Sequence, residues 1–299
     1  GKITDEISLK VKMQYEENPY PRWQQTVVSE PQSLSEIFNQ IPLRLNSKKI
    51  FDTQSPKVLI AGCGTGHQSI QTAMRFRNSE ILAVDISSAS LAYAIRKTEE
   101  YGIKNISYLQ ADLLDLQKMG KKFDIVECSG VLHHLENPFS GWKTLLGCLK
   151  SSGLMRVGLY SKLARKEIIK TRNIISESQI RPTKDQIRVF RKKMIDRNKY
   201  SYKQLSQWDD FYSMSEFRDL IFHVQEHSFT IEKIKEMLEE LKMVFCGFET
   251  EKVLKSFKKK NRQISDLYDL DKWDEFECEN PKSFSSMYQF WCQKATFKI

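Results

Sequence analysis

Between Lys57 and Tyr160 the sequence alternates short apolar runs with segments of helical periodicity. The apolar runs have the length of strands and end at glycines or polar residues, which is typical of strands buried on both faces of a sheet. Strands that alternate with helices form βαβ units with right-handed crossovers, and such units build a parallel sheet. The predicted strands are 57–61, 81–84, 106–110, 123–127 and 154–160, and the predicted helices are 67–77, 90–101 and 142–150.

The alternation stops at Ser161, after which residues 162–242 are polar and helical in pattern. One helix in this insertion is clear, because Thr230 stands at the cap position before an apolar face. Two further strands are predicted at 243–249 and 287–294. We therefore expect an N-terminal helical or lid segment (1–50), a sheet core (51–161), a basic helical insertion (162–242), and two strands that complete the sheet (243–299).

Three glycines directly follow the first predicted strand, in the run Val58-Leu59-Ile60-Ala61-Gly62-Cys63-Gly64-Thr65-Gly66. Glycine permits a tight turn and a close approach of the backbone to a ligand, where a Cβ atom would collide. The next helix presents free backbone N–H groups at its first turn. A glycine loop also occurs for packing reasons alone, but its place between a strand and a helix favours a nucleotide-binding turn. The spacing is G-x-G-x-G, not the G-x-G-x-x-G of nicotinamide and flavin enzymes.

Two aspartates end the next two predicted strands, at the edge of the sheet where parallel sheets bind ligands. Asp85 ends the second strand, and a carboxylate there can accept hydrogen bonds from both hydroxyls of a ribose. Asp112 ends the third strand, where its carboxylate and the next amide, that of Leu113, can hold the edge of an adenine. The alternatives are a surface aspartate for Asp85 and a helix cap for Asp112.

Four motifs in this order resemble the cofactor motifs of class I S-adenosylmethionine-dependent methyltransferases. They are V-L-I-A-G-C-G-T-G (58–66), A-V-D-I-S (83–87), Q-A-D-L-L-D-L (110–116) and F-D-I-V-E-C-S-G-V-L-H-H-L (123–135). The resemblance implies an α/β, Rossmann-like fold: a mostly parallel seven-stranded sheet with an antiparallel last strand and a helical insertion between strands 5 and 6. Segments at 15–23, 222–230 and 287–291 further resemble a bacterial subgroup that is often fused to tetratricopeptide repeats, although this sequence shows no such repeats.

The resemblance implies S-adenosyl-L-methionine as the cofactor and S-adenosyl-L-homocysteine as its product. The glycines would line the methionine portion, Asp85 would bind the ribose, and the fourth strand would form a wall beside the sulfonium. The implied cofactor residues are Gly62, Cys63, Gly64, Gly66, Asp85, Ile86, Asp112, Leu113, Glu127 and Ser129.

Methyl transfer to a protonated acceptor requires a base near the sulfonium. His134 follows the fourth strand and suits proton removal, although in the resembling family a histidine here often only shapes the pocket. Further along, His223 and His227 would share one face of a helix, with Glu226 beside them. This cluster, with Gln225, is predicted to be an acceptor-binding wall with a general base or a structural polar network. A metal site is the least favoured interpretation, because no third ligand is evident.

Aromatic residues also precede the sheet core, at Tyr15, Tyr20 and Trp23, together with Arg22. Two prolines stiffen this segment and prevent a helix. It is predicted either to close over the cofactor as a lid, in which Tyr15, Tyr20 and Arg22 contact the substrate, or to be a hydrophobic strap on the fold.

The net charge of +9 is concentrated in one block. Residues 162–203 contain fourteen Lys and Arg against four Asp and Glu, whereas residues 266–279 contain seven acids against one lysine. Such blocks form solvated faces, bind an anionic partner or acceptor, or face each other.

The sequence therefore predicts a methyltransferase that acts on an oxygen or nitrogen of a protein or peptide side chain, or of a small metabolite, with an acidic acceptor as one option. Less favoured are an RNA methyltransferase that uses the basic block as a phosphate track, and a catalytically silent cofactor-binding or interaction protein. The sequence shows no transmembrane helix, no signal peptide and no C-x-x-C pair among its six cysteines, so we expect reduced thiols and a cytoplasmic location.

Overall fold

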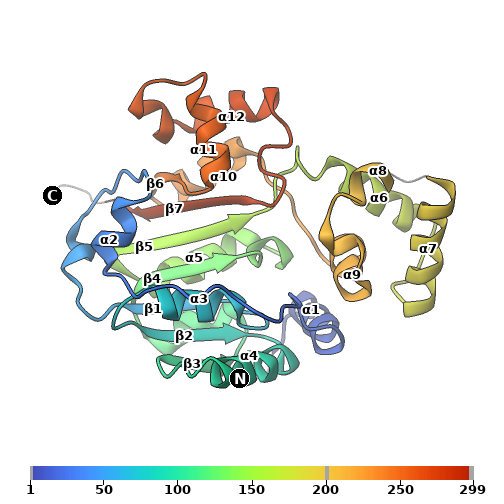
Figure 1. Cartoon of the computed structure of the whole chain (residues 1–299), viewed down its shortest axis with the longest axis horizontal. Helices are drawn as coiled ribbons and strands as arrows, with labels where there is room; N and C mark the ends of the chain where they lie inside the picture. The colour runs from blue at the N-terminus through green and yellow to red at the C-terminus, as the bar shows by residue number, and fades with distance from the viewer. Residues whose placement is uncertain (1–2, 199–201, 296–299) are drawn as a thin grey trace.

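The computed structural model describes residues 3–198 and 202–295, and a seven-stranded sheet forms its centre (Figure 1). The strand order is β3-β2-β1-β4-β5-β7-β6. Strands β1 to β5 run parallel to one another, whereas β7 is antiparallel to both of its neighbours, β5 and β6. The strands are β1 (Lys57–Ala61), β2 (Glu80–Asp85), β3 (Ile106–Gln110), β4 (Phe123–Ser129), β5 (Leu149–Leu159), β6 (Met243–Phe248) and β7 (Tyr288–Lys294). The predicted Rossmann-like fold with an antiparallel last strand is confirmed.

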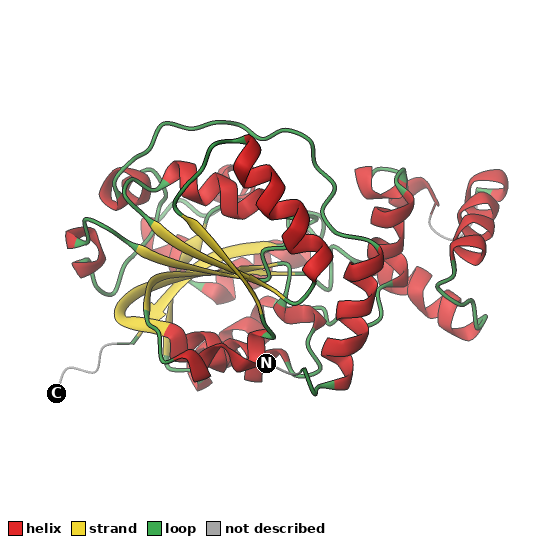
Figure 2. Cartoon of the chain, turned by 90° about the horizontal axis from the view of Figure 1, so that it is seen from below, coloured by secondary structure: helices red, strands yellow, loops and turns green. Residues whose placement is uncertain are grey.

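Helices cover both faces of this sheet (Figure 2). Because successive side chains of a strand point to opposite faces, Val58 and Ile60 pack into one apolar cluster while Leu59 and Ala61 pack into the other. The first face is covered by α2 (Leu34–Asn39), α3 (His67–Arg75) and α4 (Ser88–Glu100). The second is covered by α5 (Pro138–Cys148), α10 (Ile231–Glu240), α11 (Glu251–Lys258) and α12 (Leu270–Glu279).

Helix α5 begins earlier than the expected range of 142–150. The side chain of Asn137 accepts hydrogen bonds from the backbone N–H groups of Phe139 and Ser140, and Pro138 occupies the first helical turn. Asparagine at the cap and proline just inside it are both favoured helix starts. The local capping chemistry thus sets this boundary, and β5 begins directly after the helix.

The insertion after β5 forms a separate helical lobe, seen beside the sheet in Figure 1. It consists of α6 (Lys166–Glu177), α7 (Lys184–Arg197), α8 (Tyr202–Leu205) and α9 (Met214–Phe222). These helices share their own apolar cluster, which includes Ile168, Phe190, Phe217 and Phe222. Helix α10, in contrast, contributes its apolar face to the core of the sheet, with Thr230 capping its first turn as predicted.

The prediction that His223 and His227 lie on one helix is wrong, because α9 ends one residue before His223. From there the chain is extended, and its backbone N–H groups bond to the core. The N–H of His227 donates to the carbonyl of His133 (2.7 Å), and that of Phe229 donates to the carbonyl of Tyr160 (2.8 Å). These long-range bonds satisfy backbone groups that a helix would have satisfied internally.

Helix α1 (Glu6–Glu17) lies between the sheet and the lobe (Figure 1). On the sheet side, the carboxylate of Glu16 accepts hydrogen bonds from the backbone N–H groups of Ser88 (2.9 Å) and Ala89 (3.0 Å), at the start of α4. On the lobe side, Glu17 pairs with Arg218 of α9 (2.5 Å). The N-terminal segment therefore joins two regions that are far apart in the sequence.

Candidate functional site

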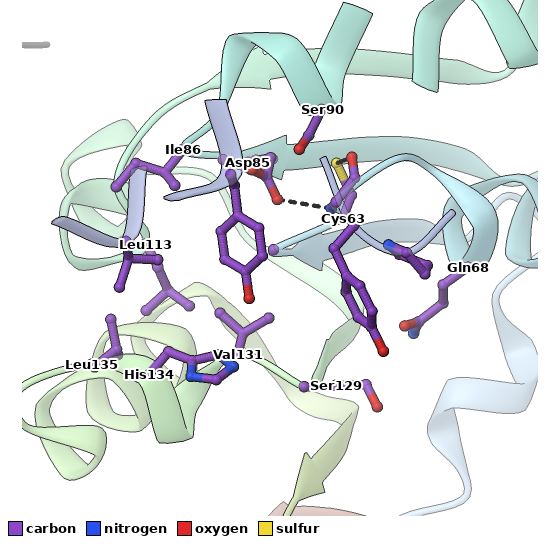
Figure 3. Close-up of a pocket in the computed structure, with 18 of the residues that line it drawn as sticks. Cys63, Gln68, Asp85, Ile86, Ser90, Leu113, Ser129, Val131, His134 and Leu135 are labelled. Carbon is purple, nitrogen blue, oxygen red and sulfur yellow. Dashed lines mark hydrogen bonds between the residues drawn. The ribbon is translucent and has the colours of Figure 1, made fainter. Parts of the chain in front are cut away.

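A cavity of about 290 Å³ lies at the carboxyl ends of β1, β2 and β4, where parallel sheets bind ligands (Figure 3). We divide its lining into two ends. The glycine-loop end consists of Gly62, Cys63, Gly64, Asp85, Ile86, Asp112 and Leu113. The tyrosine end consists of Tyr15, Tyr20, His134, Tyr160 and Asp219. Figure 3 shows Asp85 and Cys63 on one side of the cavity and His134 and Ser129 on the other.

The glycines of the loop adopt left-handed backbone conformations that favour glycine, with φ of +76° at Gly62 and +51° at Gly64. A Cβ atom on Gly62 would lie 2.2 Å from a methyl carbon of Val131, and one on Gly64 would lie 2.5 Å from the carbonyl oxygen of Tyr20. From the sequence we expected these glycines to make room for a ligand. The structure shows that they also allow Val131 and Tyr20 to pack against the loop.

Asp85 is buried at the end of β2 and holds the turn of the loop. One carboxylate oxygen accepts from the N–H of Gly64 (2.7 Å), and the other accepts from the N–H of Ser87 (2.9 Å). Burial raises the pKa of this carboxyl, while these hydrogen bonds act in the opposite direction. Each oxygen keeps acceptor capacity beyond one bond, so the side chain can still receive donors from a ligand in the cavity.

Asp112 both caps a helical turn and lines the cavity, so the two interpretations of this residue are compatible. Its Oδ1 accepts from the N–H of Leu114 (3.0 Å). Apolar side chains of Ile86 and Leu113 lie beside the two carboxylates in the same lining. A slot with apolar walls and acidic rims suits a purine nucleoside, whose ring faces are apolar and whose hydroxyl and amine groups are donors.

Two of the predicted cofactor residues do not line the cavity. A Cβ atom on Gly66 would meet Ala94 of α4 at 2.7 Å, so this glycine permits close packing of two helices. Glu127 is buried and accepts hydrogen bonds from Gln68 and Thr72 of α3. Ser129, two residues further along β4, does line the cavity, and its hydroxyl contacts the sulfur of Met287 at 3.3 Å.

The segment after α1 is fastened over the glycine loop. The N–H of Thr65 donates to the carbonyl of Tyr20 (3.2 Å), and its hydroxyl donates to the carbonyl of Pro21 (2.6 Å). The indole of Trp23 donates to the same threonine (3.1 Å). Because Tyr20 also lines the cavity, this segment is at once a strap on the fold and a wall of the site. Tyr15 lines the cavity too but lies within α1, so the expectation of a non-helical segment is wrong at this residue. Arg22 points elsewhere and lines an outer groove beside Trp23.

The ring of His134 has a defined orientation at the tyrosine end. Its Nδ1 lies 2.8 Å from the carbonyl oxygen of Gln225. A carbonyl only accepts, so Nδ1 must hold the proton and Nε2 keeps its lone pair. Burial lowers the pKa of His134 to about 3, so the ring is neutral. Nε2 takes no hydrogen bond from any described residue, and His134 lines the cavity.

A chain of hydrogen bonds lies behind this ring. His223 stacks on His134 with ring centroids 3.6 Å apart, and its Nδ1 accepts from the N–H of Gln225 (3.1 Å). Its Nε2 then holds the proton and lies 3.1 Å from the hydroxyl of Tyr15, which donates to Oδ1 of Asp219 (3.0 Å). Burial also lowers the pKa of His223 well below its usual value.

The remaining members of the predicted cluster have other positions. Glu226 is buried in ion pairs with Arg165 (3.1 Å) and Arg172 (2.9 Å) and does not line the cavity. The ring of His227 contacts the side chain of Gln225 (3.0 Å) and the carbonyl of Glu136 (3.2 Å), also outside the cavity. The structure thus gathers His134, His223 and Tyr15 but separates Glu226 and His227 from them. No group of three metal-ligating side chains occurs within residues 3–198 and 202–295.

The two charged blocks do not pair with each other in the described ranges. The acidic strip pairs with its own surroundings: Asp266 with Lys272, Asp271 with Lys235, and Glu279 with Lys260. Two arginines of the basic block, Arg165 and Arg172, form ion pairs with Glu226. Among the described residues that line the cavity, none is lysine or arginine, so the basic block does not provide an acidic acceptor with a cationic wall there.

Sequence reasoning missed Asp219, which belongs to α9 of the lobe and lines the cavity. It directly follows Arg218 and lies on the same helix as the buried residues Phe217 and Leu220. An acid next to buried apolar residues of a helix is a signal that the sequence contains, because an isolated buried charge is costly. The position of Tyr160 at the end of β5 was a further signal, by the same rule that indicated Asp85.

All six cysteines are free in the structure, and five of them are buried. Burial raises the pKa of the thiol of Cys63, which lines the cavity, well above its usual value. Within the part of the chain that the structure describes, no helix has the length and apolar character needed to cross a membrane.

Residues 58–153 match the sequence model of a family described as a methyltransferase domain. The chain is 29% identical to an uncharacterized protein of Synechococcus over 201 residues, which are 64% of this chain and 48% of that protein. It is 30% identical to a ubiquinone biosynthesis O-methyltransferase of Acinetobacter baumannii over 115 residues, which are 38% of this chain and 48% of that enzyme. The chain thus spans about half the length of these curated relatives.

Two solved structures share the fold at low sequence identity. PKMT2 from Rickettsia typhi in complex with AdoHcy has a TM-score of 0.62 and 16% identity, over 92% of this chain and 56% of that one. The [4+2]-cyclase SpnF has a TM-score of 0.50 and 14% identity, over 97% of both chains. The match to a methyltransferase domain thus covers the part of the chain that forms β1 to β4 and the start of β5, and the solved structures share the fold.

Proposed function

We propose that this chain transfers the methyl group of S-adenosyl-L-methionine to a nitrogen or oxygen atom of an acceptor, with S-adenosyl-L-homocysteine as the second product. The acceptor is a side chain of a protein or peptide, or a small metabolite. One observation supports this proposal above the others. A single cavity joins a nucleoside-type slot, with Asp85 and Asp112, to a polar end where a neutral histidine presents a lone pair.

The charge of the lining fits this cofactor. Its sulfonium group supplies an activated methyl carbon and a positive charge. The described lining contains the carboxyls of Asp85, Asp112 and Asp219 and no lysine or arginine, so it favours a cationic ligand. The loop N–H groups are already used, because Gly62 and Cys63 donate to the carbonyl of Val84. A pyrophosphate would therefore find few free donors here, which argues against a nicotinamide dinucleotide.

The residues of the tyrosine end have roles that follow from their geometry. His134 is held by its Nδ1–H and stays neutral, so its Nε2 can accept a hydrogen bond from the acceptor and orient it toward the methyl group. Gly62 and Gly64 fix the turn beneath the cofactor, and the strap through Tyr20 excludes water from that side.

Calorimetric titration with S-adenosylmethionine, S-adenosylhomocysteine and NADH tests the cofactor assignment. We expect both sulfur nucleotides to bind and NADH not to bind. Asp85→Asn should weaken both by about 10–100-fold, since a hydrogen bond to a charged group contributes about 1.5–3 kcal/mol. Asp115→Asn, which changes a partly exposed aspartate paired with Lys118, is the matched control and should bind normally. Failure of the folded chain to bind either sulfur nucleotide would overturn the proposal.

A further inference from the structure

We infer that the acceptor presents an amine to the cavity and that Asp219, from helix α9 of the lobe, receives this amine. The inference rests on the proposed methyl transfer and names the substrate class of the same site. It follows from what the tyrosine end offers to a ligand, how Asp219 is held there, and which charges surround it.

The tyrosine end offers hydrogen-bond acceptors. Asp219 has a carboxyl, His134 has an Nε2 lone pair, and the hydroxyls of Tyr20 and Tyr160 can accept. The hydroxyl of Tyr15 is already bonded to Asp219 and His223. No lysine or arginine of the described chain lines the cavity, so a phosphate or carboxylate would be desolvated there without a cation. An alcohol brings one donor, whereas an ammonium group brings three donors and a positive charge. The lining therefore matches an amine better than the other acceptor classes.

The carboxyl of Asp219 is held in a fixed direction. Its Oδ1 accepts from the hydroxyl of Tyr15 (3.0 Å) and from Nε2 of Gln14 (3.3 Å), both on α1. The proton on Nε2 of His223 fixes the direction of the tyrosine hydroxyl in turn. The other oxygen, Oδ2, takes no hydrogen bond from any described residue, although Asp219 is only 8% exposed and lines the cavity. This oxygen is accessible from the cavity, so it is free to accept a hydrogen bond from a donor group of a ligand.

The charges around Asp219 suit proton exchange near neutral pH. Burial raises the pKa of Asp219 to about 7, and Glu226 acts in the same direction. The hydroxyl of Tyr15 and the guanidinium groups of Arg172, on α6, and Arg165, just before α6, lower it. Of the other groups that face it, His223 stays neutral because burial lowers its pKa.

The proton balance of the reaction is complete with these groups. An alkylammonium acceptor passes one proton to the Asp219 carboxylate and becomes a neutral amine with a lone pair. This deprotonation also removes the repulsion between two positive charges in one cavity. The lone pair forms the new N–C bond while the C–S bond breaks, and its electron pair goes to sulfur. The product is a methylated ammonium, and the proton on Asp219 leaves to solvent.

Ligand-observed NMR titration of the full chain, saturated with S-adenosylhomocysteine at pH 8, tests the inference with three probes of one shape: n-butylamine, n-butanol and butyrate. We expect n-butylamine to bind at least tenfold more tightly than n-butanol, and butyrate not to bind. Asp219→Asn should remove this preference, because the amide keeps the shape but loses the charge. Asp209→Asn, which changes an exposed aspartate of the same lobe, should keep it.

The outcomes separate this inference from the proposed function. Equal binding of n-butanol and n-butylamine by a chain that binds S-adenosylhomocysteine would overturn the amine assignment alone. So would an Asp219→Asn protein that binds the nucleotide normally and still prefers the amine. If the wild-type chain does not bind the nucleotide, the proposed function fails, and the same titration on the unliganded chain still decides whether Asp219 receives amines. Should Asp219→Asn fail to fold, Tyr15→Phe, which leaves the carboxyl but releases Oδ1, should weaken amine binding severalfold without changing n-butanol binding.

Discussion

The two ends of the cavity are built in different ways. The glycine-loop end comes from three consecutive strand–loop units, and its key contacts join neighbours in the sheet, as between Asp85 and the N–H of Gly64. The tyrosine end joins α1 and the strap after it, the turn after β4, the end of β5, and α9. There Tyr15 contacts Asp219 and His223, more than two hundred residues away in the sequence. The first end depends on one local motif, and the second depends on the docking of separate elements.

Because of this difference, sequence changes in the lobe and sequence changes in the glycine loop should affect different ends of the cavity. Changes in the helical lobe can alter the tyrosine end without touching the turn that Asp85 and the glycines form. Sequence divergence in the lobe is then compatible with an unchanged cofactor and a changed acceptor, which is how one fold comes to serve many reactions. Four predictions test whether the two ends are as separable as their construction indicates.

The largest effect is expected for Glu226→Ala, which leaves Arg165 and Arg172 buried without their anion. Breaking such a pair typically costs about 3–5 kcal/mol. We expect this loss in the free energy of unfolding measured with urea, and faster amide hydrogen exchange in α6 and α9. Glu232→Ala, which changes an exposed glutamate of α10, should change stability by less than about 0.5 kcal/mol. Loss of S-adenosylhomocysteine binding in the folded Glu226→Ala protein would show that the two ends are not independent.

The tyrosine end should also make the protein sensitive to acid. Burial lowers the pKa values of His133, His134 and His223, so the unfolded chain binds more protons below about pH 6.5 and stability falls as pH falls. Each histidine contributes a loss of up to about 1.4 kcal/mol between pH 7.5 and 5.5. Asp219 contributes to the pH dependence of stability with the opposite sign and stabilises the fold as pH falls. Its pKa is raised to about 7, so the folded state binds its proton more tightly than the unfolded state does.

Asp219→Asn should therefore steepen the loss of stability between pH 7.5 and 5.5 by about 2 kcal/mol. Urea unfolding at the two pH values measures this difference. In contrast, His223→Gln should make the loss smaller, by about the contribution of one histidine. Parallel pH profiles for the wild type and Asp219→Asn would contradict the raised pKa of this carboxyl.

The glycine-loop end is tested by Gly64→Ala. The added Cβ atom would lie 2.5 Å from the carbonyl oxygen of Tyr20, at a residue with φ of +51°. We expect a loss of about 1–3 kcal/mol in stability and at least tenfold weaker binding of S-adenosylhomocysteine. Gly120→Ala is a matched control, because its φ is +65° but no atom lies within 4 Å of the added carbon. Equal effects of the two substitutions would show that backbone strain, and not the strap, explains the result.

The smallest effect is expected for Tyr15→Phe. It removes one hydroxyl from the bond chain between His223 and Asp219, which should lower stability by about 0.5–1.5 kcal/mol. Nucleotide binding measured by calorimetry should stay the same. Tyr212→Phe removes an exposed hydroxyl that donates to the carbonyl of Ser206, and it should have a smaller effect. If Tyr15→Phe binds the nucleotide more weakly than the wild type does, Tyr15 also contributes to the glycine-loop end of the cavity.

The sequence predicted the part of the molecule whose signals are local. Apolar runs located the strands, and the residues that follow them included Asp85, Asp112 and His134, because the edge of a parallel sheet is determined by strand direction. The helix expected across His223 and His227 was wrong because bonds to the distant carbonyls of His133 and Tyr160 set the backbone there. Asp219 was missed for a related reason. Its role depends on the docking of α1, which no local pattern encodes.

The strand order has a consequence for how the sheet is completed during synthesis. Strand β7 comes last in sequence among the seven strands of the described sheet, yet it lies between β5 and β6. Until β7 leaves the ribosome, β5 has an open edge and β6 has no partner, even though β1 to β4 can already pair. An open edge of this kind is a template for aggregation. Translation that stops before Tyr288 would thus yield a chain with most of its strands and an unprotected sheet, the form that chaperones and proteases would have to handle.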